Sequence, residues 1–193
     1  MLTIPNFLTL LRIIAVPVFL IVVSNRHYGA GLVIYLAAGI TDTIDGVIAR
    51  LTNSYSALGA ALDPLADKLF LVSGFLMMTW LGIVPVWLLI LVLTRDVVIL
   101  SGYLVIYFVT QPIEVDPSVL GKLNTFFEMM TMGFALTTLS RPDMPMATVN
   151  LYTWYLTGTT VAISGIQYVY RGLLWYQRQG SVPAAAGGVT RER

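Results

Sequence analysis

The chain has 193 residues, of which 57% are hydrophobic and only 11% are charged, and its formal net charge is +1. A soluble domain carries roughly 25% charged residues. The low charge and the mean hydropathy of +0.80 therefore argue against a soluble protein and indicate an integral membrane protein. With no basic cluster, nucleic acid is excluded as an expected partner.

Six apolar segments predict an all-α, polytopic membrane protein with six transmembrane helices. Each segment reaches about the 20 residues that cross a bilayer, and Gly, Pro, Ser or Asn mark the breaks between them. The segments are 5–24, 29–51, 57–82, 84–110, 118–139 and 149–172. We expect one membrane domain over 1–176 and a disordered cytoplasmic tail over 177–193.

Basic residues predict the orientation of the six helices. An even number of spans puts both termini on one side, and seven basic residues would lie on that side against two on the other. The positive-inside rule then places the termini and the turn near 50–58 in the cytoplasm, and we expect the bacterial inner membrane. The seven are Arg50, Lys68, Lys122, Arg171, Arg178, Arg191 and Arg193, and the two are Arg26 and Arg141.

Four aspartates stand in the stretch TDTIDGVIARLTNSYSALGAALDPLADK, residues 41–68. Asp42 and Asp45 are three residues apart and Asp63 and Asp67 are four apart, so each pair shares one face of its predicted helix. A tight turn between the two helices would bring both pairs to a similar depth, about 12 Å from that turn. The four carboxylates are therefore expected to converge on one point.

Such a cluster calls for cations, because four carboxylates in a low-dielectric region cannot all stay ionised alone. The chain has no cysteine and one histidine, so oxygen ligands would hold the metal, and Mg²⁺, Mn²⁺ or Ca²⁺ is favoured over Zn²⁺. A pair of such ions is a known clamp for displacement at phosphorus. The alternative, interfacial aspartates without a joint role, is disfavoured because the spacing suits both helices at once.

The same stretch resembles the signature of the CDP-alcohol phosphatidyltransferases. Its fixed positions read Asp42-x2-Asp45-Gly46-x2-Ala49-Arg50-x8-Gly59-x3-Asp63-x3-Asp67. IPNFLTLLR at residues 4–12, TRDVV and GKLNT are similar to the phosphatidylglycerophosphate synthase and cardiolipin synthase branch. The resemblance implies a six-helix membrane enzyme, commonly a homodimer, with its active site open to the cytoplasm. Such an enzyme moves a phosphatidyl group from CDP-diacylglycerol to an alcohol and releases CMP.

The resemblance also implies roles for single residues. Asp42, Asp45 and Asp63 would be ligands of Mg²⁺ or Mn²⁺, with two ions expected, and Asp67 would touch a metal and act as the general base. The nucleotide would pack against the small residues Gly46, Ala49 and Gly59.

Further polar residues are predicted to bind substrate. Asn6, Arg12 and Arg50 are donor-binding candidates, although Asn6 also suits a helix cap, Arg12 snorkelling to the interface, and Arg50 a helix C-terminus. Arg95 and Lys122 are acceptor-binding candidates, and the alternative for Arg95 is a neutralising pair with the adjacent Asp96.

The sequence leaves two acceptors open, and it also leaves open two classes of protein other than an enzyme. Phosphatidylglycerol, which would make the chain a cardiolipin synthase, is favoured over glycerol 3-phosphate, the acceptor of a phosphatidylglycerophosphate synthase. The reason is that Tyr103 and Asn124 stand where the resemblance to phosphatidylglycerophosphate synthases implies basic residues. A carboxylate-lined cation transporter would need access from both membrane faces, whereas these aspartates lie toward one. A catalytically silent scaffold would not need the intact set of aspartates.

Overall fold

The computed structural model describes residues 4–52, 57–110 and 119–180. Near several helix ends, chiefly over 4–8, 43–52 and 57–63, it describes the helix without its side chains. These residues form six helices: α1 (Ile4–Ser24), α2 (Tyr28–Thr52), α3 (Ala57–Trp80), α4 (Val86–Thr110), α5 (Val119–Ser140) and α6 (Ala147–Gly180).

The predicted all-α class is confirmed, and the described residues contain no strand. Helix ends lie close to the predicted ones because turn residues define them. Gly82, with a φ of 76°, and Pro85 separate α3 from α4. The exception is α6, which was expected to end at 172 and runs through Gly172 to Gly180, since its sequence contains no proline. Residues 177–180 of the predicted tail are thus helical, and 181–193 lie outside the described residues.

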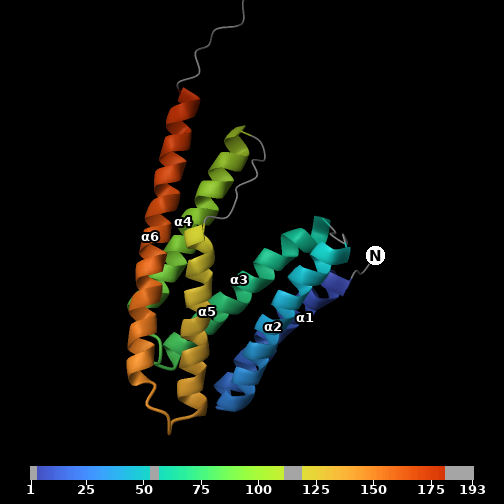
Figure 1. Ribbon diagram of the computed structural model, residues 1–193, viewed down its shortest axis with the longest axis vertical. Helices are drawn as coiled ribbons and strands as arrows, with labels where there is room; N and C mark the ends of the chain where they lie inside the picture. Colours follow the sequence, from blue (N-terminus) through green and yellow to red (C-terminus); the bar gives the residue numbers. More distant parts are fainter. Residues whose placement is uncertain (1–3, 53–56, 111–118, 181–193) are drawn as a thin grey trace, which may run out of the picture.

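The helices form two groups that meet in the middle of the molecule (Figure 1). In that view, α1 and α2 lie on one side, α4 and α6 on the other, and α3 and α5 run between them, with α3 strongly tilted. Helix α1 packs against both α2 and α3, while α6 packs against both α4 and α5. The start of α1, the end of α2 and the start of α3 lie near one another, at the same end of the bundle as the end of α6.

An apolar core fills the junction between the two groups. Its fully buried members include Phe19, Phe75, Met78, Met132 and Leu136, which come from α1, α3 and α5. The rings of Phe19 and Phe70 contact each other at 5.3 Å between centroids. Over the residues that the structure describes, none of the six helices is long and apolar enough to cross a membrane.

Candidate functional site

Arg12 of α1 lies between one aspartate of α2 and one aspartate of α3. Its Nη2 atom is 2.9 Å from Oδ1 of Asp42, and its Nη1 atom donates a 2.7 Å hydrogen bond to Oδ1 of Asp67. The arginine side chain is only 4% exposed. A buried guanidinium is costly unless it is paired, and these two carboxylates supply the pairing. The structure therefore brings one carboxylate of each helix to a single point.

The other two aspartates belong to the same helices, Asp45 to α2 and Asp63 to α3. Their helical spacing from Asp42 and Asp67 is as predicted, but their side chains lie outside the described part of the structure. Among the side chains that are described, no three acidic or histidine groups come together around a metal position. The donor-binding predictions on Asn6, Gly46, Ala49, Arg50 and Gly59 likewise fall on residues whose burial and contacts lie outside the described part of the structure.

A cavity of about 420 Å³ opens beside Arg12, Asp42 and Asp67. Its polar end is formed by these three residues, and the remainder is mostly apolar. The other lining residues are Tyr35, Leu36, Ala38, Gly39, Ile40, Phe70, Leu71 and Met129. A cavity with ionised groups at one end and an apolar wall suits an amphipathic ligand, whose polar group would lie at the carboxylates.

Tyr35 closes this cavity toward α5. Its hydroxyl donates a 2.6 Å hydrogen bond to the carbonyl oxygen of Met129, and its ring stacks on Phe70 at 6.2 Å between centroids. The hydroxyl of Tyr35 is thus satisfied by the backbone, and its ring packs on Phe70, which also lines the cavity.

A second group of charges lies next to Asp67, on the side of α3 that faces α4. The Nζ atom of Lys68 donates to both carboxylate oxygens of Asp96, at 2.6 and 2.7 Å. Arg95 donates through Nη1 to Asp96 at 3.0 Å and through Nη2 to the hydroxyl of Ser164 at 3.2 Å. Its guanidinium also lies 5.7 Å from the centroid of the Tyr168 ring. These contacts join α3, α4 and α6 beside the site formed by Asp42, Asp67 and Arg12, which we call the acidic site.

The two predicted acceptor-binding cations differ in position. Arg95 is 9% exposed and forms the pair with Asp96 that was the alternative interpretation of its charge. Lys122 is exposed in the first turn of α5 and makes no ion pair with a described residue. The structure therefore does not bring Arg95 and Lys122 together.

Helix α5 carries a buried polar pair, of which the sequence interpretation considered Asn124, as a neutral residue at the acceptor site, but gave no role to Glu128. Asn124 donates a 2.7 Å hydrogen bond to Oε1 of Glu128, and the Thr160 hydroxyl donates to Asn124 at 3.4 Å. Asn124 and Glu128 are 0% and 1% exposed. Their i, i+4 spacing in an apolar helix is the sequence signal that would have revealed the pair.

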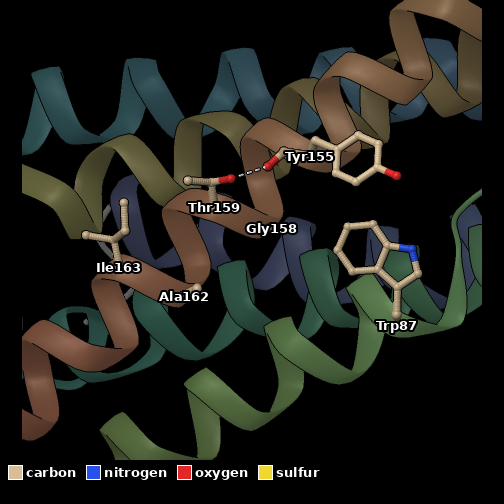
Figure 2. Close-up of a pocket in the computed structure, with 6 residues that line it drawn as sticks. All are labelled: Trp87, Tyr155, Gly158, Thr159, Ala162 and Ile163. Carbon is tan, nitrogen blue, oxygen red and sulfur yellow. Dashed lines mark hydrogen bonds between the residues drawn. The ribbon is translucent and has the colours of Figure 1, made fainter.

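A second cavity of about 420 Å³ lies between α4 and α6 and has a different character (Figure 2). Trp87 stacks on Tyr155 at 5.8 Å between centroids, and the Thr159 hydroxyl donates to the Tyr155 carbonyl at 2.7 Å. A Cβ added to Gly158 would lie 2.8 Å from the Trp87 ring, so the glycine allows this close packing. The lining holds no ionisable carboxylate or cation, which makes it a packing crevice and not a site for phosphoryl chemistry.

The donor atoms at the acidic site fit a hard divalent cation. Asp42 and Asp67 present carboxylate oxygens, which Mg²⁺ and Mn²⁺ prefer, and no thiolate is present in the chain. Asp45 and Asp63 stand one turn away from them along the same two helices. The residues present therefore suit an oxygen-coordinated ion between α2 and α3.

Comparison with known proteins gives a family match over most of the chain. A model of the CDP-alcohol phosphatidyltransferase family matches residues 2–166. The chain is 32% identical to a probable cardiolipin synthase (CMP-forming) of Drosophila melanogaster, over 86% of this chain and 56% of that protein. It is 30% identical to the human cardiolipin synthase (CMP-forming), over 88% of this chain and 62% of that protein.

A third relative has a different name. A probable phosphatidylglycerophosphate synthase of Mycobacterium tuberculosis is 35% identical, over 87% of this chain and 80% of that protein. The chain thus spans little more than half the length of the insect relative and most of the length of the mycobacterial one.

Proposed function

The chain belongs to the CDP-alcohol phosphatidyltransferase family, and we propose that it transfers the phosphatidyl group of CDP-diacylglycerol to the hydroxyl of a glycerol-type acceptor, with release of CMP. The observation that carries this proposal is the convergence of Asp42 and Asp67 on Arg12 at the polar end of an otherwise apolar cavity. Both substrates are amphipathic if the acceptor is a lipid, and this cavity matches that character.

In the proposed reaction, Asp67 takes the proton from the acceptor hydroxyl as its oxygen attacks the phosphatidyl phosphorus. The bond from that phosphorus to the CMP oxygen breaks, and CMP leaves with the electron pair. Direct attack is favoured because the chain has no cysteine, and its single histidine, His27, lies beyond the end of α1 that is remote from Arg12. Arg12 fixes the Asp67 carboxylate through its 2.7 Å contact.

The remaining site residues keep the roles proposed from the sequence. Asp42, Asp45, Asp63 and Asp67 would hold Mg²⁺ or Mn²⁺, with two ions proposed. When bound, such ions neutralise a pyrophosphate and stabilise the leaving group. The donor would contact Asn6, Arg12, Gly46, Ala49, Arg50 and Gly59.

We propose that the six helices lie in a membrane, as a homodimer in the bacterial inner membrane, with both termini and the active site on the cytoplasmic side. The support is the exposure of large apolar side chains on several helices, such as Val33 at 65%, Val97 at 65% and Ile166 at 70%. An apolar surface of this extent is unfavourable in water, whereas lipid chains cover it without cost.

We propose phosphatidylglycerol as the acceptor, so that the product is cardiolipin. Asn124, a position where a phosphomonoester site should be basic, is neutral, buried and bonded to Glu128. Glycerol 3-phosphate remains the second candidate, because the phosphatidylglycerophosphate synthase relative is matched over 80% of its length.

The purified protein in detergent micelles tests this function. Cytidine-labelled CDP-diacylglycerol should release CMP only when an acceptor is added, and EDTA should abolish the release until Mg²⁺ or Mn²⁺ is restored. Release of CMP without any dependence on acceptor would contradict the transfer reaction. Full activity in metal-free buffer would contradict the metal proposal.

A further inference from the structure

Lys68, Asp96 and Arg95 form a continuous set of charge contacts, which we call the Lys68–Asp96–Arg95 network. Arg95 is the inner member, held by Asp96 and Ser164 and 9% exposed. Lys68 is the outer member, with its side chain 40% exposed. An ammonium group has three donors, and two distances of 2.6 and 2.7 Å tie it to Asp96. The network therefore presents its positive charge to a ligand through Lys68.

Lys68 is also at the correct depth for a substrate that reaches Asp67. The two residues are consecutive in α3, so their Cα atoms differ by about 1.5 Å along the helix axis. Asp67 turns toward Arg12 of α1, whereas Lys68 turns toward Asp96 of α4. A glycerol unit with its hydroxyl at Asp67 carries its phosphate three carbons away, which is the kind of separation that the long lysine side chain can bridge.

The charge of this network is limited. Lys68 and Arg95 bring two positive charges and Asp96 brings one negative charge, which leaves one positive charge. Glu128 is a further carboxyl group that interacts electrostatically with all three members, and Asn124 holds it in place. Whatever the ionisation of Glu128, the surplus is therefore at most one positive charge.

We propose that Lys68, positioned by Asp96 and Arg95, binds the phosphate of the acceptor and selects a phosphodiester monoanion over a phosphomonoester dianion. A surplus of at most one positive charge can match the one negative charge of a phosphodiester but leaves a phosphomonoester under-neutralised. This inference rests on the proposed transfer reaction. It assigns to Lys68 the contact that was predicted for Arg95 and Lys122, and it gives Arg95 a positioning role through Asp96.

Steady-state kinetics with phosphatidylglycerol and glycerol 3-phosphate, each as the single acceptor, test the proposal. Lys68→Met should raise the KM for phosphatidylglycerol about tenfold or more, as expected for loss of a charge-assisted contact, and leave the KM for CDP-diacylglycerol unchanged. Lys68→Arg, which keeps the charge, should recover most of the loss. The control is Arg141→Gln, an exposed cation between α5 and α6, which should change neither KM.

Asp96→Asn tests the charge argument itself. It adds one positive charge to the network, so the ratio of kcat/KM for glycerol 3-phosphate to that for phosphatidylglycerol should rise about tenfold. If Asp96→Asn does not fold, the comparison of Lys68→Met with Lys68→Arg still tests whether Lys68 binds the acceptor phosphate. An unchanged acceptor KM in Lys68→Met, or a change confined to the donor KM, would overturn the proposal.

A failure of the reaction itself would be recognisable. Wild-type protein would then release no CMP with either acceptor. The inference could still be tested by binding. Wild-type and Lys68→Met protein would each be titrated with phosphatidylglycerol in mixed detergent micelles, and tryptophan fluorescence would give the affinity of each for the lipid. Weaker binding by the variant supports it, and equal binding contradicts it.

Discussion

Arg12 and Lys68 show at the residue scale what spacing predicts and what it leaves open. The helical spacing of the four aspartates predicts a shared site, and Asp42 and Asp67 do meet around one guanidinium. The partner of Lys68 was not predictable, because Asp96 lies on another helix and its approach depends on how α3 and α4 rotate against each other. The spacing of residues in the sequence does not reveal a contact between long side chains on two different helices.

Substitution of Asp67 separates the proposed base from the proposed metal ligands. Asp67→Asn should lower kcat about 10²-fold to 10⁴-fold, the usual contribution of a positioned acid or base, while donor binding is largely kept. Asp42→Asn should lower the affinity of the protein for Mn²⁺, measured by calorimetry, more strongly than Asp67→Asn does. Asp143→Asn, an exposed aspartate beyond α5, is the control and should change neither quantity. A near-normal kcat in Asp67→Asn would show that another group takes the proton.

The elements were predictable because long apolar runs and turn residues fix where helices begin and end. What remained open was how they pack, since α3 is tilted across the molecule and contacts both groups of helices (Figure 1). Close approach of two helices requires a small residue at the crossing. Gly31 of α2 fills that role against α1, where Val23 is fully buried.

Gly31→Ala should lower stability through this crossing. The new Cβ would lie 2.6 Å from Cγ2 of Val23, and a β-branched side chain in a helix has little rotamer freedom with which to move away. Overpacking of this kind costs about 1–3 kcal/mol. Thermal unfolding in detergent should show a lower Tm, whereas the matched Gly29→Ala, where nothing lies within 4 Å, should not. Equal Tm values for the two variants would contradict the described α1–α2 packing.

At the scale of the whole molecule, the acidic site and the Lys68–Asp96–Arg95 network lie on different faces of one helix, α3. That helix connects the α1–α2 group to the α4–α6 group, so the proposed donor and acceptor sites would meet at Asp67 and Lys68. Sequence alone predicted the number of helices and the acidic motif. The junction was not predictable, because it arises from contacts between residues 28 to 94 positions apart in the chain.

Identification of the lipid product tests the central claim most directly. Purified protein would be given CDP-diacylglycerol together with equal amounts of phosphatidylglycerol and glycerol 3-phosphate, and lipids and CMP would be quantified by mass spectrometry, with Asp67→Asn as the inactive control. We expect cardiolipin and CMP in equal amounts, with little phosphatidylglycerophosphate. Phosphatidylglycerophosphate as the main product would contradict the proposed acceptor, and CMP without either lipid would contradict phosphatidyl transfer.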